Sequence, residues 1–382
     1  MMQTATTTIP LTKVTMGEEE ERAVLDVLRS GWLVQGARVA AFEQRVAGYC
    51  GARHAVATTN CTTALQLALH QLGLQRGDEV IVPSFTFVAS INAILHAGGI
   101  PRIVDVEPGT WNIDPMSVEA AINRNTRAIM PVDQFGLAAD LHAIHELASR
   151  HHLRVVEDAA PSLGAAINDV RVGSISEMTC FSFHPRKTIT SAEGGMVLTD
   201  NDELATRMRV LRSHGASVSD LARHTSDNVV IESYDEPGFN FRMSDLHAAV
   251  GLTQMDRLDG LIAKRRALAE AYDGAFAHLD SLTVVEPQPG FFHTYQSYCI
   301  VLTDASPVNR EEAMRKLTAA GVTTRRGCGA VHLEPFFVKR FGLARLPVSE
   351  RLSARSIAIP LYPSMSDGEQ HYVVEQVVGM LR

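Results

Sequence analysis

The chain has 382 residues, of which 46% are hydrophobic and 20% are charged, a composition typical of a globular protein with a sizeable buried core. Its 43 acidic residues outnumber its 35 basic ones, which gives a formal net charge of −8. There is no basic stripe with interleaved aromatic residues, so no nucleic-acid partner is expected. Residues 1–14 do not have the pattern of a secretory signal and no segment has the length of a membrane span, so we expect a cytoplasmic protein without membrane contact. Five widely spaced cysteines without a CxxC pair argue against a disulfide framework and a zinc site.

The first 200 residues alternate between strand and helix patterns. Residues 17–50 predict two helices separated by a loop, with a glycine stop at Gly31. Seven later segments have the pattern of strands: 54–59, 78–84, 100–107, 127–133, 154–160, 178–183 and 194–199. Helical patterns at 63–73, 87–99 and 140–152 lie between them, which predicts parallel βαβ units. No GxGxxG motif follows a strand, and this argues against a nicotinamide-binding Rossmann domain.

The rest of the chain predicts a second, smaller unit. A helix is expected at 202–214, followed by a polar stretch at 215–238 that predicts an exposed loop. A long helical pattern then begins at Ser244 and Asp245, which can cap it. Strand and helix patterns continue from 297 to 381. We therefore expect a large domain over 1–250 and a small C-terminal α/β domain over 251–382, with the N-terminal segment able to pack on the small domain.

A cluster of small polar residues opens the helix predicted at 63–73. Five hydroxyl and amide residues crowd there: Thr58, Thr59, Asn60, Thr62 and Thr63. The free N–H groups of a helix's first turn form an anion site, and the hydroxyls of threonines can add donors. The cluster therefore predicts a phosphate site, although plain N-capping explains part of it equally well.

Two carboxylates, Glu157 and Asp158, stand at the end of a strand predicted to be buried. Because side chains alternate across a strand, the two are expected to point to opposite faces of the sheet. A carboxylate at this edge is costly unless a cation or a hydrogen-bond donor meets it. A helix cap or a buried structural ion pair is the alternative interpretation.

Lys187 follows the strand predicted at 178–183, which Pro185 ends because proline has no N–H for a strand ladder. An exposed loop lysine is the ordinary explanation of such a residue. However, an anion-binding helix end, a carboxylate and a lysine at neighbouring strand ends are together what pyridoxal 5'-phosphate requires. The lysine would form a Schiff base, the acid would protonate the pyridine nitrogen, and Arg186 could help to lower the pKa of the amine.

Several motifs resemble those of the DegT/StrS-type nucleotide-sugar aminotransferases, which are fold-type I pyridoxal-phosphate enzymes. The resemblance covers nearly the whole chain and is specific in these segments: "GARHAVATTNCTTALQLAL", "GDEVIVPSFTFVAS", "VVEDAAPSLGA", "FSFHPRKTITSAEGGM" and "GFNFRMSDLHAAVGLTQ". It implies an α/β fold in which helices enclose a mainly parallel seven-stranded sheet of a large domain, beside a smaller C-terminal α/β domain. It also implies a homodimer with shared active sites.

The resemblance assigns a role to individual residues. Lys187 would form the Schiff base and Asp158 would pair with the pyridine nitrogen. Phe87 would stack on the ring, and Asn240 would reach the phosphate of the neighbouring subunit's cofactor. The remaining phosphate contacts would come from Ser182 and from the turn that contains Cys61, Thr62 and Thr63.

Three residues depart from the family pattern. Cys61 stands where the family usually has glycine, which would bring the backbone less close to the phosphate. Pro161 stands where many members have a glutamine that contacts the ring hydroxyl, and proline cannot make that bond. Asp133 stands where many members have histidine. All three bear on the substrate rather than on the core chemistry.

The implied reaction moves an amino group from a donor, expected to be L-glutamate, to a keto group of a nucleotide-linked sugar. Relatives that dehydrate their substrate have histidine at the lysine position, so Lys187 argues against that chemistry. Two alternatives stay open: another carbonyl acceptor such as a ketocyclitol, and a cofactor-binding regulator without turnover.

Several further residues are candidates for contact with the substrate. Arg325 and Arg326 follow a strand of the small domain and could bind a diphosphate bidentately, or could be ordinary exposed charges. His332 and Tyr295 are placed as in relatives whose small domain lines the sugar pocket. His142 and His145 are three residues apart on a predicted helix, but no third ligand accompanies them and no metal site is expected.

Overall fold

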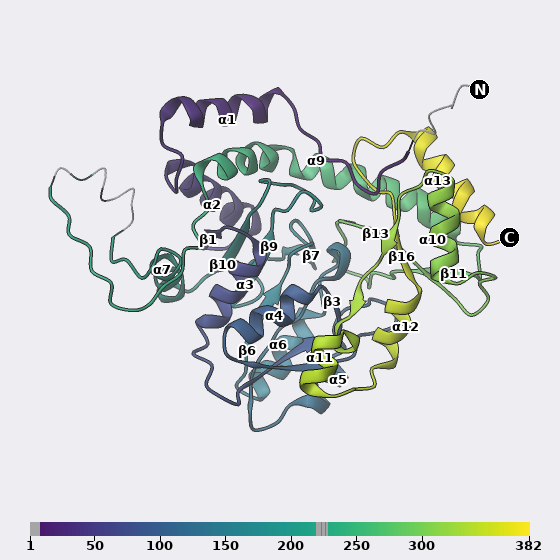
Figure 1. The fold of residues 1–382 in the computed structure, drawn as a ribbon, viewed down its shortest axis with the longest axis horizontal. Coiled ribbons are helices and arrows are strands. Elements are labelled where there is room, and N and C mark those ends of the chain that lie inside the picture. The colour runs from purple at the N-terminus through teal and green to yellow at the C-terminus, as the bar shows by residue number, and fades with distance from the viewer. Residues whose placement is uncertain (1–7, 219–222, 224–225, 227) are drawn as a thin grey trace.

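A computed structural model describes residues 8–218, 223, 226 and 228–382 of the chain. The chain folds into two lobes, and the long helix α9 (Asp245–Phe276) extends from the large lobe into the small one (Figure 1). As predicted, Ser244 caps this helix, since its side chain accepts a hydrogen bond from the backbone N–H of His247. In the described part of the chain, no helix is long and apolar enough to cross a membrane.

The large lobe is built on one sheet of seven strands. Their order across the sheet is β1 (His54–Thr58), β10 (Gly195–Thr199), β9 (Met178–Ser182), β6 (Arg154–Asp158), β5 (Thr126–Ile129), β2 (Glu79–Pro83) and β4 (Ile100–Val104). Only β10 runs antiparallel to its neighbours, and the other pairs are parallel. The predicted mainly parallel seven-stranded sheet is thereby confirmed.

Helices cover both faces of this sheet, because successive strand residues point to opposite sides. Val156 of β6 joins the apolar cluster under α3 (Cys61–His70), α4 (Val88–His96) and α7 (Asp202–Leu211). Val155 joins the opposite cluster, under α2 (Ala37–Cys50), α5 (Pro115–Ala121), α6 (Leu141–Arg150) and the first half of α9. Helix α1 (Glu18–Ser30) lies on the outer side of α9 (Figure 1).

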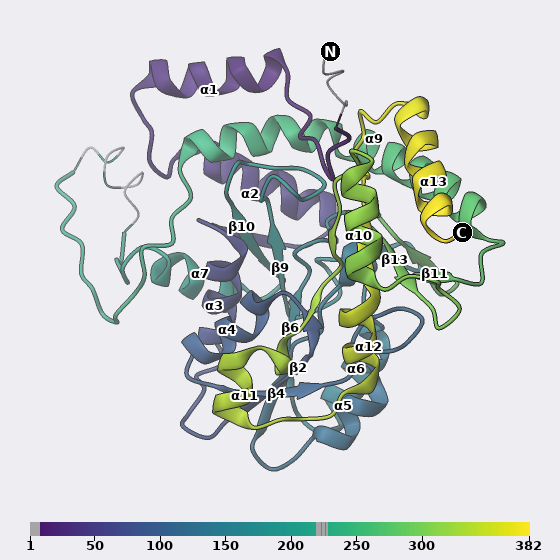
Figure 2. The same cartoon turned by 45° about the vertical axis from the view of Figure 1, so that its right-hand side comes forward.

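The small lobe has a four-stranded sheet in the order β11 (Leu282–Val284), β13 (Tyr298–Leu302), β16 (Ser356–Ile359) and β14 (Arg325–Arg326). Its core includes residues of α10 (Arg310–Ala319), α13 (Asp367–Met380) and the end of α9, while α12 (Pro347–Arg355) leads into β16. The N-terminal segment also packs here: Ile9 is buried in this core and pairs with Val322 (Figure 2). Since α9 belongs to both cores, the domain boundary at residue 250 stays a prediction.

Several short elements were not predicted. These are β3 (Phe85–Thr86) with β15 (Gly329–Ala330), the small sheet of β12 (Phe291–Phe292), β7 (Ala166–Ile167) and β8 (Val170–Arg171), helices α5 and α11 (Pro335–Phe341), and the 3-10 helices η1 (Gln134–Gly136) and η2 (Val331–Leu333). Two-residue ladders give no local pattern, because they form only when distant segments meet. Of the loop predicted at 215–238, residues 219–222, 224–225 and 227 lie outside the described residues, and Val229 and Ile231 in the rest are exposed.

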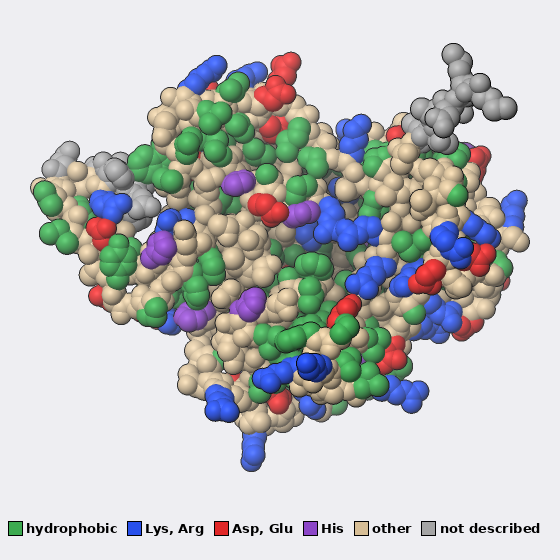
Figure 3. All heavy atoms as spheres, viewed as in Figure 1, with side chains coloured by type: hydrophobic (Ala, Val, Ile, Leu, Met, Phe, Trp, Pro, Cys, Tyr) green, Lys and Arg blue, Asp and Glu red, His purple; other side chains and the backbone are tan. Residues whose placement is uncertain are grey.

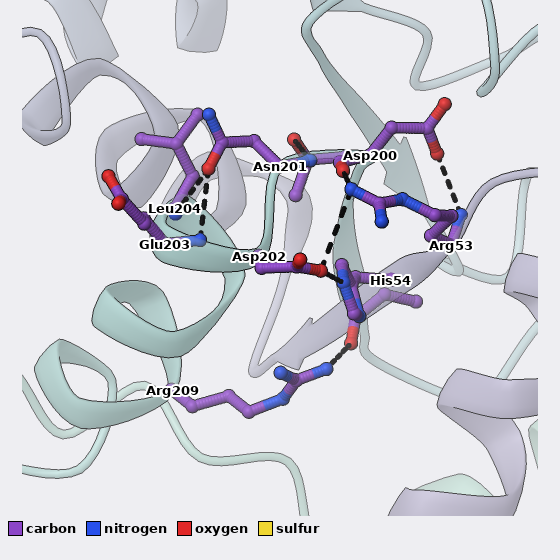
Figure 4. Close-up of polar contacts among 10 residues, drawn as sticks. Arg53, His54, Asp200, Asn201, Asp202, Glu203, Leu204 and Arg209 are labelled. Carbon is purple, nitrogen blue, oxygen red and sulfur yellow. Dashed lines mark hydrogen bonds and ion pairs between the residues drawn. The ribbon is translucent and has the colours of Figure 1, made fainter.

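Strand β1 is an edge of the large sheet, and side chains satisfy its outer backbone groups. Glu43 accepts from the N–H of Ala57 at 2.8 Å, Arg212 donates to the carbonyl of Ala57 at 2.8 Å, and Arg209 donates to that of Ala55 at 3.4 Å. Figure 4 shows how the residues before β1 meet the start of α7. There Asp200 and Asp202 accept hydrogen bonds from Arg53 and His54, and Asn201 caps the helix.

Asp245, at the start of α9, ties this helix to α2. Its carboxylate is buried and accepts hydrogen bonds from three backbone N–H groups, those of Gly36 at 2.9 Å, Arg38 at 3.2 Å and Val39 at 3.0 Å. These are the groups that the first turn of α2 cannot satisfy by itself. One side chain therefore caps α2 and fixes it against α9.

We predict that Asp245→Ala lowers the free energy of unfolding by about 2–3 kcal/mol, because buried N–H groups lose a charged acceptor. Urea denaturation would measure the change. The control is Asp256→Ala on the same helix, whose exposed ion pair with Arg45 should contribute at most about 1 kcal/mol. Equal effects of the two substitutions would contradict the assigned role of Asp245.

Candidate active site

Lys187 lies in the turn that follows β9, and the backbone N–H of Lys187 donates to the carbonyl of His184 at 2.8 Å. Strands β9 and β6 are parallel, with Asp158 opposite Cys180, so their carboxyl ends meet at one edge of the sheet. Burial lowers the pKa of the Lys187 amine, while the nearby Cys61 and Asp158 act in the opposite direction. The lysine and the carboxylate are thus close enough for each to feel the charge of the other.

Asp158 is buried beneath the start of α4. Its Oδ2 accepts from the hydroxyl of Ser90 at 2.7 Å, and its Oδ1 accepts from the N–H of Ala160 at 3.2 Å. Burial raises the pKa of this carboxyl group, and these two hydrogen bonds and the charge of Lys187 oppose the rise. Sequence analysis missed Ser90, for which the only signal is a hydroxyl within an otherwise apolar helix.

The first turn of α3 is both a capped helix start and an open donor site. The side chain of Asn60 accepts from the N–H of Thr63 at 3.0 Å, and the hydroxyl of Thr63 donates back to the carbonyl of Asn60 at 2.7 Å. The hydroxyl of Thr63 is therefore used within the cap. The N–H groups of Cys61 and Thr62 donate to no other described residue, so they remain available to an anion.

Gly195 lets this turn approach the sheet closely. A Cβ atom there would lie 2.3 Å from the carbonyl oxygen of Asn60 and 2.6 Å from the nitrogen of Cys61. Gly195 is also paired with Ser182 across β10 and β9, so Ser182 lies beside the turn. The structure thus brings together the residues predicted to hold a phosphate.

Cys61 does not block this arrangement. Its Sγ lies 4.0 Å from the carbonyl oxygen of Cys180, which places the thiol against the sheet, and burial raises its pKa well above the ordinary range. Cys328, which sequence analysis missed, also lies near Lys187 and Asp158, and burial raises the pKa of its thiol to about 11. All five cysteines of the chain are free.

These groups fit pyridoxal phosphate. The Lys187 amine lies close enough to the buried Asp158 carboxylate for their charges to interact, and backbone donors that no described residue satisfies lie at the adjacent helix start. Phe87, at the N-cap of α4, is 65% exposed and free to meet a ring. Asn240 is exposed and pairs through its backbone with Ser213, and its contact with a second subunit stays a prediction. Pro161 lies three residues after the end of β6 at Asp158.

The two arginines predicted to follow a strand of the small domain instead form strand β14 itself, and the charge of Arg325 reaches the site. Both are exposed. Two causes lower the pKa of Arg186, the residue before Lys187: its burial is the larger, and the positive charge of Arg325 is the second. Arg326 contacts Glu334 at 3.4 Å. Figure 3 shows Lys and Arg side chains gathered beside the hollow between the lobes.

His332 and Tyr295 are placed differently. His332 is buried, with Nδ1 at 2.6 Å from the hydroxyl of Ser84 and Nε2 at 3.4 Å from Oε1 of Glu350. Both of its nitrogens therefore have protein partners. Tyr295 lines a separate cavity of the small lobe, where it stacks on His293 with ring centroids 3.9 Å apart. Neither side chain has a hydrogen bond to Lys187 or Asp158, and a role of either residue in substrate binding stays a prediction.

His142 and His145 do not belong to a cluster of possible metal ligands. His142 is exposed, and Nε2 of His145 lies 3.1 Å from the hydroxyl of Ser176. Within the described ranges, no group of three or more His, Cys, Asp or Glu side chains could hold a metal ion.

Asp133, one of the three departures, pairs with Glu157 on the sheet face opposite Asp158. Both side chains are fully buried. Asp133 accepts from the N–H of Ala139 at 2.9 Å and from the hydroxyl of Ser162 at 2.6 Å, and Glu157 accepts from Thr179 at 2.8 Å. Oε1 of Glu157 has no hydrogen-bond partner within the described residues, and both Ser176 and a protonated Asp133 are near enough to lower the pKa of Glu157 by donating to it. Burial, reinforced by the charge of Glu157, raises the pKa of Asp133 well above its usual range, so the pair shares one proton.

Comparisons with known proteins agree with this geometry. The family model described as "DegT/DnrJ/EryC1/StrS aminotransferase family" matches residues 14–378. The spore coat polysaccharide biosynthesis protein SpsC of Bacillus subtilis (strain 168) is 36% identical over 386 aligned positions, which cover 100% of this chain and 99% of SpsC.

Solved structures are similar over the whole fold. DesV of S. venezuelae is 32% identical, with a TM-score of 0.91 over 99% of this chain and 100% of DesV. The sugar aminotransferase Spr1654 of Streptococcus pneumoniae in its PMP form is 27% identical, with a TM-score of 0.92 over 97% of this chain and 98% of Spr1654. A PLP form of Spr1654 is also similar, with a TM-score of 0.90 over 98% of each chain.

The Asp133–Glu157 pair predicts how stability depends on pH. Since the pKa of Asp133 is higher in the folded than in the unfolded chain, folding takes up a proton between the two values, and stability falls as the pH rises through that window. Wild type should lose up to about 1.4 kcal/mol per pH unit there, whereas Asp133→Asn, whose amide donates to Glu157 without titrating, should show a flatter profile. Urea denaturation over a pH series that begins at about 4, the unfolded-state pKa of an aspartate, and extends upward would measure both. The exposed Asp169→Asn serves as control, and a slope unchanged in Asp133→Asn would contradict the shared proton.

Proposed function

Because this chain belongs to the DegT/DnrJ/EryC1/StrS aminotransferase family and is a pyridoxal-phosphate-dependent sugar aminotransferase, we propose that Lys187 is the residue that binds its cofactor. The observation that supports this most directly is the position of Lys187 beside the buried Asp158, next to the open first turn of α3. The amino donor is proposed to be L-glutamate, and the acceptor a keto group on a nucleotide-linked sugar.

The chain's own residues would hold the cofactor at both ends. Asp158, fixed by Ser90, would keep a proton on the pyridine nitrogen, because a buried carboxylate needs a positive partner. The N–H groups of Cys61 and Thr62, with the hydroxyls of Thr62 and Ser182, would bind the phosphate. Phe87 would cover the ring.

Lys187 would also move the proton that transamination requires. When bound, pyridoxal phosphate supplies an electron sink that stabilises negative charge at the α-carbon of the donor. The lowered pKa of Lys187 suits an amine that takes a proton from that carbon and returns it elsewhere. The nitrogen of the donor finally replaces the keto oxygen of the sugar, and the donor leaves as its keto acid.

The acceptor assignment is supported by the cationic group around the site. Arg325 lies near Arg186, and Arg326 is its neighbour on β14. Guanidinium groups bind phosphate oxygens bidentately, so this cluster suits a diphosphate. A ketocyclitol lacks that group, which makes the two acceptors distinguishable.

We further propose that the protein is a homodimer with shared active sites. Asn240 is exposed at the end of the segment that precedes α9, and α1 and the loop after it expose apolar side chains: Leu25, Leu28, Leu33 and Val34. Such side chains are candidates for burial against a second copy. A cytoplasmic location remains a prediction.

We predict that Lys187→Ala abolishes turnover, with a loss of at least about 10²–10⁴-fold, because it removes both the attachment and the proton carrier. Purified protein with added pyridoxal phosphate would be followed by visible absorbance and by product formation with L-glutamate and a keto-sugar nucleotide. The control is Lys264→Ala, an exposed lysine on α9. Cofactor absorbance that no amino donor changes would favour the regulator, and activity retained in Lys187→Ala would exclude the assigned role.

Replacing Arg325 tests the acceptor. Arg325→Ala should raise KM for a nucleotide-linked keto-sugar by roughly ten- to hundredfold with little change in kcat, since a charged contact with the substrate contributes about 1.5–3 kcal/mol. Kinetics with a ketocyclitol should be unaffected, and the exposed Arg345→Ala provides the control. If wild type aminates only the ketocyclitol, the nucleotide-sugar assignment is wrong while the aminotransferase chemistry stands.

A further inference from the structure

A short chain of buried hydroxyl groups leads away from Asp158 beneath the start of α4. The hydroxyl of Ser90 contacts Oδ2 of Asp158 at 2.7 Å, and the hydroxyl of Thr86 contacts that of Ser90 at 2.9 Å. Ser90 is 1% exposed and Thr86 is 2% exposed, so solvent does not replace these contacts. Among the described residues, Ser90 is the one hydrogen-bond partner of the Thr86 hydroxyl. An acid and two hydroxyls therefore follow one another in a defined order.

The charge of Asp158 determines which group donates at each step of this chain. An ionised carboxylate carries no proton and can only accept a hydrogen bond. Ser90 has a single hydroxyl proton, and its other acceptor, the carbonyl of Phe87, is more distant at 3.2 Å. The proton of Ser90 is therefore directed at Asp158. The contact between the two hydroxyls then contains a proton only when Thr86 donates to Ser90.

Thr86 belongs to β3, and the pairing of β3 with β15 fixes its backbone (Figure 1). Thr86 lies opposite Gly329 in this antiparallel pair, and the N–H of Val331 donates to the carbonyl of Ser84 at 2.9 Å. The residue after Thr86 is Phe87, which is exposed, whereas Thr86 is buried. One short segment thus directs a hydroxyl toward the acid and leaves an aromatic ring free beside it.

We propose that Thr86 is a positioning residue of the amino transfer: its hydroxyl donates to Ser90, which leaves the Ser90 proton for Asp158 and keeps that carboxylate ionised toward the pyridine nitrogen of the cofactor. This inference rests on the proposed pairing of Asp158 with that nitrogen. Each hydrogen bond in such a chain polarises the next, so Thr86 strengthens the bond between Ser90 and the carboxylate. A better stabilised carboxylate takes up the shared proton less readily, and the proton stays on the ring nitrogen, where it supports the electron sink.

Pyridoxal phosphate that is isotopically labelled at the ring nitrogen would test this role, because the NMR shift of that nitrogen depends on its protonation. Bound to the full-length wild-type protein, the nitrogen should be protonated. Thr86→Val nearly keeps the shape of the side chain and removes the hydroxyl, so the NMR shift should move part of the way toward the unprotonated value, and the Kd for pyridoxal phosphate should rise about threefold. Thr86→Ser keeps the hydroxyl and should resemble wild type in both. Ser90→Ala removes the donor to Asp158 itself and should move the NMR shift further than Thr86→Val.

Thr126→Val is the control for the loss of a buried threonine elsewhere in the large lobe. Thr126 stands at the amino end of β5, where its hydroxyl accepts from the N–H of Asn123 at 3.0 Å, so its replacement should leave the NMR shift and the Kd unchanged. An unchanged NMR shift in Thr86→Val or Ser90→Ala, or a Thr86→Ser variant that behaves like Thr86→Val, would overturn this inference alone. A ring nitrogen that stays protonated in Asp158→Asn would show that Asp158 is not its partner, and the proposed role of Asp158 would then fail together with this inference.

Discussion

The parallel pairing of β6 with β9 determines where every group of the proposed site lies. Its register puts Asp158 opposite Cys180, so one strand ends in a carboxylate while the next leads into the turn that contains Lys187. Strand β10 then aligns Gly195 with Ser182 and lets the start of α3 approach. A shift of this register by one residue would turn Asp158 to the other face of the sheet, because side chains alternate along a strand.

Strand β6 places two neighbouring acids in opposite environments. Asp158 faces α4, Ser90 and Lys187, where a positive partner can balance it. Glu157 faces the core under α6 and α9, where no cation is available among its hydrogen-bond partners, and a proton on Asp133 takes that place. The same cost of burying charge is therefore met in two ways on either side of one strand.

Two buried arginines show the same constraint. Arg212 forms an ion pair with Glu43, and together they satisfy the outer edge of β1. Arg265 is at least as deeply buried, yet its hydrogen-bond partners among the described residues are backbone carbonyls, which reduce the cost of burial without neutralising the charge.

The sequence by itself determined the mainly parallel sheet, the positions of its strands and most helices, and the candidacy of Lys187 and Asp158. Apolar periodicity and strand-end polar residues are local signals, and the family motifs added the cofactor and the reaction class. Tertiary structure decided which side chains pair when segments that are distant in the sequence come together. In the tertiary structure the hydroxyl of Thr63 is used in the helix cap, while the N–H groups of Cys61 and Thr62 stay available. His332 is buried between Ser84 and Glu350. Asp133 lies beside Glu157. Tertiary structure also placed Arg265 among backbone carbonyls, with no acidic partner in the described part of the chain. Such pairings depend on burial and on contacts between residues far apart in the chain, and no spacing within a single segment specifies them.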